Sequence, residues 1–328
     1  MAGELNIKGL KRRDDLMEVV DESPFTELQL VASKVLPEAP VKRASAQVPV
    51  KPVGNGKKVE DTRRATGGGF NRGSWKLDER SYITAVKGFE EGYDTIDDTV
   101  VQTEINLDQD NECAILARNT VLIARESRVA SKVYDTAVFT GADYNLTPAT
   151  KWDNAADIKA DIVAGANKIK ARFGVSQRQL SLTLNPTTID IILDQTSVKE
   201  SIKYVSDSGV PMELMTQEAQ VAFLAKYLRV GEIIVVESLA DSNDLGVDGS
   251  DFVDLWNPAY AMLAYTSKTP SFRSAGLGVQ PVFTPYAADI RFDEYDNKAT
   301  SQHIIRASEY RGEYINKEFG FLFTDILS

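Results

Sequence analysis

The spacing of apolar residues predicts one unusually long helix in the first half of the chain. The stretch from Tyr93 to Thr140 has no glycine or proline, and its acidic start and basic end complement a helix dipole. A helix over 110–139 would be about 45 Å long at ~1.5 Å per residue. Its apolar positions form two stripes, which indicates a helix between two layers. The first stripe contains Cys113, Leu116, Ala117, Thr120, Ile123, Ala124, Ser127, Tyr134 and Val138, and the second contains Ile115, Leu122, Val129 and Val133.

The residues before this helix predict less regular structure. Residues 1–40 indicate one or two short helices that end at Pro37 and Pro40. The glycines and prolines of 41–76 predict a long loop, and loops of this length are usually functional or disordered. Residues 82–107 alternate loosely between apolar and polar positions, which favours extended or mixed structure.

After Gly141 the pattern changes to helices alternating with short strands. Asp153 is a candidate cap for a helix that ends at Gly174, and a strand over 180–184 follows it. Asn185 and Pro186 have the residue types that favour a helix start.

The last part of the chain predicts one more helix and several strands. The helix covers 216–228, and the strands lie at 232–238, within 252–266 and at 319–327. Residues 288–315 predict a long hairpin with Asp296 and Asn297 at its turn.

Composition agrees with an ordinary soluble protein of two or three domains. The chain has 328 residues, of which 43% are hydrophobic and 26% are charged. No window approaches 18 consecutive apolar residues, so we expect no membrane span. The N-terminus lacks the apolar core of a signal peptide, which favours a cytoplasm. The single cysteine, Cys113, excludes an intrachain disulfide.

Charge is distributed unevenly along the chain. The net charge is −11, yet residues 41–76 contain nine basic and two acidic side chains. A basic arm on an acidic body can dock on the acidic surface of a neighbouring copy, or it can contact nucleic acid. A solvated linker would have the same composition.

Candidate catalytic chemistry is sparse. His303 is the only histidine, and no nucleophile-elbow motif accompanies it. Residues 67–69 are three glycines without the Gly-Lys-Ser/Thr ending of a phosphate loop. The aspartates of the 241–251 loop do not follow calcium-loop spacing, and they are Asp241, Asp244, Asp248 and Asp251. We therefore predict no enzyme activity, and no catalytic, cofactor-binding or metal site.

The order of these parts resembles the major capsid proteins of tailed bacteriophages, the Hong Kong 97-type fold that encapsulins share. The basic loop before the long helix resembles the E-loop of that family, and Asp110 to Phe139 resembles its spine helix. The strand–Asn-Pro–helix sequence LSLTLNPTTIDIIL resembles the entry into the axial domain. RFDEYDNKATSQHIIRASEYRGEYI resembles the peripheral-domain hairpin, whose second strand commonly carries an arginine near Arg306 or Arg311.

The resemblance implies an α+β fold divided along the family's lines. The expected parts are an N-terminal arm at 1–45, an E-loop at 46–80, a peripheral domain at 81–150 with the spine helix at 110–139, an axial domain at 151–268, a peripheral return hairpin at 269–315 and a closing axial strand at 316–328. Because about 40 residues precede the loop, we expect a retained arm and a separately encoded scaffold.

The implied function is that of a coat protein that assembles into pentamers and hexamers around phage DNA. The implied partners are further copies of the chain, a scaffolding protein, a portal, possible decoration or cement proteins and double-stranded DNA bound without sequence specificity, with no membrane. The implied location is the virion, and the host cytoplasm during assembly. Some relatives form Lys–Asn crosslinks, for which the candidates are Lys57, Lys58 or Lys76 with Asn297 or Asn316, although most relatives lack them.

Two alternatives remain open. An encapsulin-type nanocompartment shell has the same fold, but its N-terminal region is usually shorter than residues 1–76. An α/β enzyme would need a concave site with convergent polar groups, and the sequence has no candidate cluster.

Overall fold

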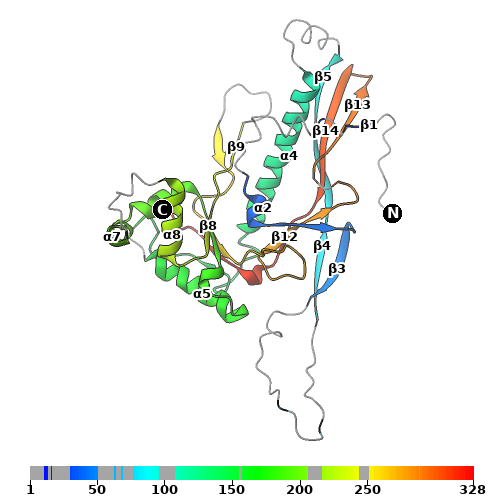
Figure 1. Cartoon of the computed structure of the whole chain (residues 1–328). Coiled ribbons are helices and arrows are strands. Elements are labelled where there is room, and N and C mark those ends of the chain that lie inside the picture. Colours follow the sequence, from blue (N-terminus) through cyan, green and yellow to red (C-terminus); the bar gives the residue numbers. More distant parts are fainter. Residues whose placement is uncertain are drawn as a thin grey trace.

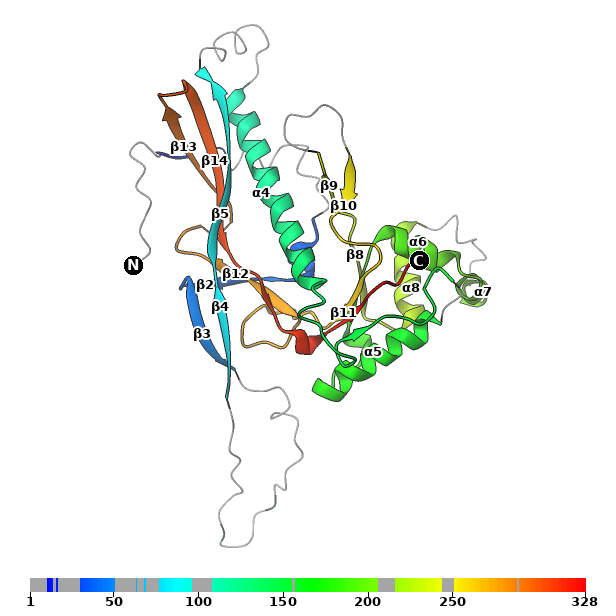
Figure 2. The same ribbon diagram turned by 180° about the vertical axis from the view of Figure 1, so that it is seen from behind.

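Two sheets and one long helix organise the chain. The computed structural model describes residues 11–13, 16, 30–50, 63, 68, 77–95, 108–154, 157–205, 216–243, 251–287 and 289–328. In Figures 1 and 2 the long helix α4 (Gln109–Val133) lies along a tall sheet, and a second sheet with several helices lies to one side of its lower end. None of the described helices is both long and apolar enough to cross a membrane.

The tall sheet is built around the C-terminal hairpin. β13 (Arg291–Asn297) pairs antiparallel with β14 (Gln302–Arg311), and β14 pairs on its other edge with β5 (Ala85–Asp94). Four further strands complete its seven: β1 (Lys11–Arg12), β2 (Glu38–Val41), β12 (Gly278–Phe283) and β15 (Tyr314–Ile315). Segments from both ends of the chain are therefore neighbours in one sheet.

The second sheet has five strands in the order β6-β16-β11-β7-β8. These strands are β6 (Asn145–Leu146), β16 (Gly320–Phe323), β11 (Ala261–Ala264), β7 (Ser181–Leu184) and β8 (Glu232–Val235). The helices beside it are α5 (Ile158–Phe173), α6 (Pro186–Asp194), α7 (Thr196–Val205) and α8 (Gln217–Leu228). Three strands of this sheet, β7, β11 and β16, are fully buried, so it forms the centre of the largest apolar core.

Local sequence signals account for several helix ends. Asn185 caps α6 by accepting a hydrogen bond from the Thr187 backbone, with Pro186 in the first turn, as predicted. Thr216 caps α8, and Gly174 ends α5 in the left-handed conformation at φ 63°. The predicted cap Asp153 is wrong, because Asp157 caps α5.

Helix α4 is shorter than predicted and buries a different face. It ends at Val133, because the Asp135 side chain accepts the Ala137 backbone N–H in a local turn that competes with the helix. The predicted two stripes are wrong: Leu116 is 52% exposed and Ala124 is exposed. The buried residues of α4 are Cys113, Ala114, Ala117, Val121, Arg125, Glu126, Val129, Ala130 and Val133.

The two ends of α4 belong to different cores. Towards its N-terminus, Ala117 and Val121 pack with apolar residues of the β13–β14 hairpin. Towards its C-terminus, Val129 and Val133 pack in a cluster that also contains residues of β8, β11 and β16. The helix therefore joins the tall sheet to the second sheet.

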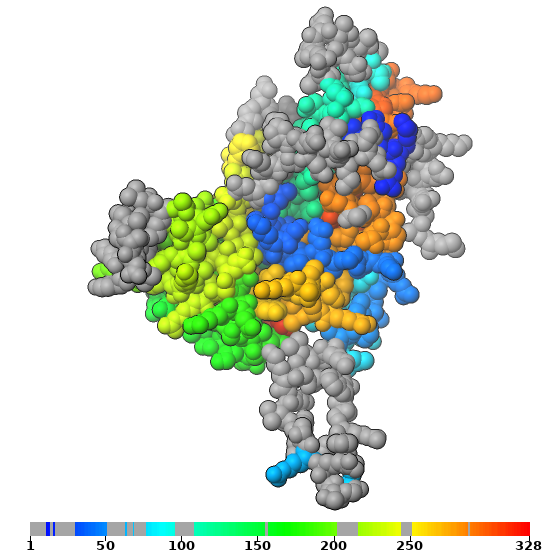
Figure 3. Space-filling model, in the orientation of Figure 1, coloured from blue at the N-terminus to red at the C-terminus, as the bar shows by residue number. Residues whose placement is uncertain are grey.

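The N-terminal region departs from the sequence prediction. The described helix α2 (Ala32–Val35) has only four residues, and β2 continues through Pro40 as a parallel strand beside β12. Pro40 is tolerated there because β2 pairs with β12 alone among the described strands, so its missing N–H removes no second ladder. In Figure 3 residues 31–50 lie across the front face, between the second sheet with its helices and the tall sheet.

Two smaller ribbons extend from these layers. β3 (Ser45–Val50) pairs antiparallel with β4 (Asp78–Ile83), within a region predicted to be loop, and β9 (Leu239–Asp241) pairs with β10 (Phe252–Asp254). The hairpin turn of β13–β14 lies after Asn297, because Asp296 and Asn297 still pair with β14. The predicted turn was therefore placed too early.

Candidate functional site

Glu126 lies where α4 meets three other parts of the chain. It is 1% exposed, and its carboxylate accepts the backbone N–H groups of Val31 at 3.2 Å and Ala32 at 2.9 Å. It also accepts Trp256 Nε1–H at 2.6 Å and Ser238 Oγ–H at 3.2 Å. Two of these donors belong to the otherwise unpaired N–H groups at the start of α2. With four donors the carboxylate is saturated, so it fixes positions rather than reacts.

One turn further, charged side chains join α4 to β14. Arg125 Nε donates to Glu309 Oε2 at 2.8 Å, and Arg128 Nη2 donates to Glu309 Oε1 at 2.5 Å. Glu309 has no exposed surface. Although burial opposes ionisation of Arg125, the charges of Glu309, Asp289 and Glu38 raise its pKa, so the guanidinium stays charged.

Arg311 extends this network to the N-terminal segment. Its guanidinium is 1% exposed and donates to Glu38 Oε1 and to Asp289 Oδ1, each at 2.5 Å. Glu38 lies on β2, so the network connects α4, β14 and β2. Removing one member of a buried ion pair typically costs about 3–5 kcal/mol, because the partner charge remains buried. The second arginine of the family pattern, Arg306, donates to Glu90 on β5 at 2.6 Å instead.

The only histidine belongs to a separate cluster at the other end of α4. His303 Nε2 lies 3.6 Å from Asp110 Oδ1 and 3.8 Å from Glu294 Oε2, and Nδ1 contacts Asp296 at 2.7 Å. Its side chain is 18% exposed, so it is more buried than the surface residue that we predicted. One ligand atom from each of His303, Asp110 and Glu294 lies within 4.8 Å of the others, a spacing that a metal ion could use.

Protein cations already occupy this cluster. Arg13 Nη1 lies 3.0 Å from Asp110 Oδ2 and 2.5 Å from Glu294 Oε2, and Lys11 Nζ lies 2.8 Å from Glu294 Oε1. Burial opposes ionisation of Glu294, but Lys11 and Arg13 hold its pKa below the ordinary value. A metal ion would have to displace Arg13, so the cluster is better understood as an ion-pair clamp between β1 and β13.

The other candidate groups are not brought together. Asp241 and Asp251 lie on or beside the β9–β10 ribbon, and Asp241 accepts two backbone N–H groups, from Asn243 and Asp251, each at 3.0 Å. Asn297 Oδ1 accepts the Ala299 N–H and Asn316 accepts the Glu318 N–H, so each stabilises a turn. The remaining candidates, Gly67, Gly69, Lys57, Lys58, Lys76, Asp244 and Asp248, lie outside the described residues, and of Gly68 only its place is described.

The sole cysteine is buried and poorly ionised. Cys113 faces the tall sheet from α4 and is 8% exposed. Burial raises its pKa to about 11, and the charges of Glu91, Asp110 and Glu112 add to the effect. A thiol with that pKa is not an activated nucleophile at neutral pH.

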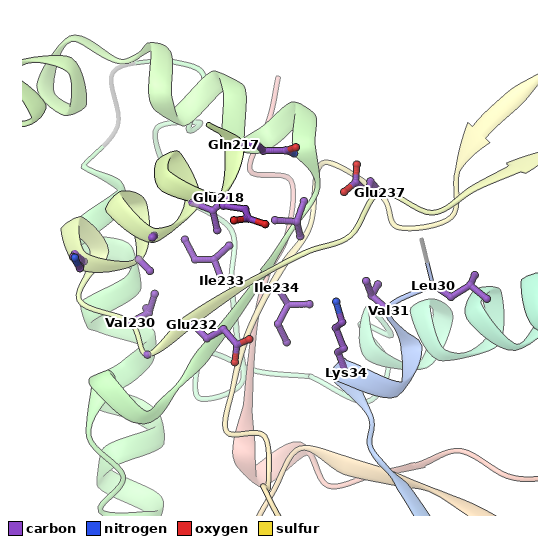
Figure 4. A pocket seen from close by; sticks show the side chains of 16 residues that line it. Leu30, Val31, Lys34, Gln217, Glu218, Val230, Glu232, Ile233, Ile234 and Glu237 are labelled. Atoms are coloured by element: carbon purple, nitrogen blue, oxygen red, sulfur yellow. The ribbon is translucent and has the colours of Figure 1, made fainter. Parts of the chain in front are cut away.

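An open groove of about 840 Å³ lies between α8, β8 and the start of α2 (Figure 4). Apolar side chains such as Val221 and Ile233 share its lining with Glu218, Glu232 and Lys34. Its described lining contains no serine, cysteine or histidine. The groove therefore lacks the nucleophile–base pairing that would identify a hydrolytic site.

Comparisons with known proteins identify the fold. No protein-family model matches the chain, and no curated protein matches it. A solved structure of a phage-related protein from Bordetella bronchiseptica RB50 is similar, with a TM-score of 0.67, 16% identity and coverage of 96% of this chain and 97% of that one. The mature capsid of bacteriophage PhiM1 gives a TM-score of 0.53 with 15% identity, covering 88% and 84%. A virus-like particle from Pyrococcus furiosus gives 0.51 with 13% identity, covering 94% and 95%.

These similarities extend over nearly the whole chain and include both sheets. The chain therefore has an α+β fold of the Hong Kong 97 capsid type, as the sequence resemblance predicted. Sequence reasoning missed Glu126 and the Arg125–Glu309 pair. The only available signal was charged residues on a helix face that is otherwise buried, and that signal is visible only when the correct face is known.

Proposed function

We propose that this chain is a shell subunit, the major capsid protein of a tailed bacteriophage, which assembles into the pentamers and hexamers of an icosahedral head around double-stranded DNA. The observation that carries the proposal is the likeness over nearly the full length of the chain to a phage-related protein and to two particle-forming proteins. A likeness of this extent leaves no additional domain among the described residues for a separate activity.

The internal contacts support a structural role. Glu126 and the Arg125–Glu309–Arg311 network fix α4, β14 and the N-terminal segment relative to one another with buried, saturated polar groups. A subunit that must present the same surfaces in every copy of a shell benefits from such rigid junctions. The described residues contain no arrangement of nucleophile, base and oxyanion donor that would favour catalysis.

We further propose that the parts have the roles of their counterparts in this fold. The arm would be 1–45, the E-loop 46–80, the peripheral domain 81–150 and 269–315, and the axial domain 151–268 with 316–328. Partners beyond other copies would be a scaffolding protein, a portal and possible decoration or cement proteins. The head would contain the DNA without reading its sequence, and assembly would take place in the host cytoplasm.

Particles recovered from cells that carry the gene test this proposal. We expect icosahedral shells built from the 36.1 kDa chain that protect double-stranded DNA from added nuclease. Shells that enclose a folded enzyme and no DNA would identify the alternative, a nanocompartment of the encapsulin type. A chain that remains monomeric in those cells and in concentrated solution would overturn both.

A further inference from the structure

Large apolar side chains are exposed in two main places among the described residues. Three of the seven such side chains lie on the β9–β10 ribbon, and three lie on or beside β4 and the start of β5. We call residues 239–254 the acidic ribbon and residues 41–86 the basic arm. The exposed apolar residues of the ribbon are Leu239, Phe252 and Val253, and those of the arm are Leu77, Ile83 and Val86.

The two surfaces carry opposite charge. The acidic ribbon contains five aspartates and no lysine or arginine, whereas the basic arm contains ten basic and four acidic residues. Apolar side chains surrounded by charge of one sign are typical of a protein contact surface whose partner carries the other sign. Each surface therefore has, elsewhere on the same chain, a partner of matching chemistry.

The acidic ribbon is held in a defined shape. Phe252 pairs with Asp241, and Leu239 pairs with Asp254, so these four side chains share one face of the ribbon. Ser242 Oγ donates to Asp251 Oδ2 at 3.0 Å within the same ribbon. The 64% exposed Phe252 is thus presented on an ordered scaffold rather than on a free strand.

The base of the ribbon is anchored to the second sheet. Asn185, which caps α6 at the end of β7, donates through Nδ2 to Asp254 Oδ1 at 3.1 Å. The ribbon therefore keeps its direction relative to the rest of the subunit. Backbone hydrogen bonds from Asn243 and Asp251 lower the pKa of Asp241, which keeps its carboxylate charged at neutral pH.

The stem of the basic arm is anchored in the same way. Tyr82 stacks on Phe272 with ring centroids 4.4 Å apart, and Arg80 Nη1 donates to the Phe272 carbonyl at 2.8 Å. These contacts fix one face of β4, while Ile83 remains 77% exposed. Lys42 and Arg43, at the start of the arm, are also exposed.

We propose that the acidic ribbon of one subunit binds the basic arm of a second copy of this chain. Within one subunit the ribbon lies beside α4 and the β3–β4 stem lies beyond the tall sheet, as both views show (Figures 1 and 2). A contact between two different surfaces of identical chains is heterologous, and repeated heterologous contacts close into rings. The contact rests on the proposed shell function and names the surfaces that would join neighbours within a pentamer or hexamer.

Charge reversal with a reciprocal rescue tests this contact. The arm variant is Lys42→Glu with Arg43→Glu, and the ribbon variant is Asp248→Lys with Asp251→Lys. Each is expected to slow particle formation roughly tenfold or more, because matched charges accelerate association by factors of about 10–10³. The combined variant has the wild-type net charge and should recover most of the rate. Glu218→Lys with Glu232→Lys changes net charge as the ribbon variant does, but alters only the groove, and should assemble normally.

Cross-linking then identifies the contact directly. Wild-type chains labelled with ¹⁴N and ¹⁵N are mixed, concentrated and treated with a carbodiimide, which couples carboxylates to lysines without a spacer. Mixed-isotope peptides that join residues 239–254 to lysines of residues 41–86 are the expected product. High salt during assembly should reduce their yield, because the Debye length falls from about 10 Å at 0.1 M to about 3 Å at 1 M.

The outcomes separate this contact from the shell function. If both reversal variants form particles at the wild-type rate, or if the arm lysines couple only to other acids, the contact is wrong and the shell function stands. If the arm variant assembles normally but its particles lose nucleic acid, the arm binds nucleic acid and the contact is also wrong. If wild-type chains form neither particles nor mixed-isotope cross-links, both proposals fall.

Discussion

Replacing Glu126 should separate the parts of the subunit that this residue holds together. Glu126→Ala removes the acceptor of four hydrogen bonds, two to the start of α2 and one each to Ser238 and Trp256. Hydrogen bonds to a charged group contribute about 1.5 kcal/mol each at the low end, which gives roughly 6 kcal/mol before relief of the buried carboxylate. We expect a net loss of about 3–5 kcal/mol in the free energy of unfolding.

Two substitutions at and near this position refine the prediction. Glu126→Gln keeps one acceptor oxygen but places an NH₂ group against a donor, so we expect about half the loss of the alanine variant. Glu112→Ala is the control, because Glu112 is exposed in the first turn of the same helix and contributes less than about 1 kcal/mol.

Thermal and urea unfolding measure the effect. A loss of 3–5 kcal/mol should lower Tm by about 6–15 °C in a chain of this size. Trp256 fluorescence should shift towards that of a solvated indole before global unfolding, since its Nε1–H loses its acceptor. If Glu126→Ala costs no more than Glu112→Ala, the carboxylate does not fix the junction and this reasoning is refuted.

Three further predictions concern other junctions. Arg311→Met leaves the buried charge of Glu309 short of a partner and should cost about 3–5 kcal/mol in urea unfolding, whereas a loss below ~1 kcal/mol would show the network to be dispensable. Burial opposes ionisation of Glu313, but Lys87 and Arg128 hold its pKa below the ordinary 4.5. Its contribution to stability should therefore be complete above pH 4.5 and disappear as the pH falls through the lower folded-state pKa, and Glu313→Gln should flatten that pH dependence. A Cβ at Gly165 would lie 2.8 Å from the nearest ring atom of β16, so Gly165→Ala should cost about 1–3 kcal/mol by calorimetry, and an unchanged Tm would contradict this packing.

The sequence predicted best what neighbouring residues decide. The Asn185–Pro186 start of α6, the Thr216 cap of α8 and the Gly174 end of α5 depend on side chains within a few positions of the helix end. Their signals are short-range and were found without knowledge of the fold. The strands at 180–184 and 319–327 were predicted for a similar reason, because continuous apolar runs bounded by polar residues indicate buried strands.

The face of α4 could not be predicted because its partners are remote in the sequence. A helical wheel assigns charged residues to solvent, yet Arg125 and Glu126 are buried against Glu309 and Trp256, which are 184 and 130 positions away. Leu116 was assigned to a buried stripe and is instead 52% exposed. Polar partners from distant strands therefore outweighed the apolar periodicity of the helix.

The N-terminal region shows the same limitation. Pro40 was interpreted as a breaker, but β12 supplies a parallel edge on which a proline-containing strand can pair. Val31, Val35 and Leu36 then pack into the core shared by α4 and the second sheet. Deleting residues 1–76 would remove part of that core, so such a deletion could not separate assembly from folding.

A smaller replacement tests the central claim without that difficulty. Val50 pairs with Asp78, so an Asn-Gly turn in place of residues 51–77 can close the β3–β4 hairpin and leave the packed stem intact. The measurement is sedimentation velocity with negative-stain microscopy on the full chain and on this replacement. The account predicts closed shells or rings from the full chain, and a folded subunit of unchanged Tm that does not assemble from the replacement. A full chain that sediments as a monomer at every concentration, identically to the replacement, would contradict it.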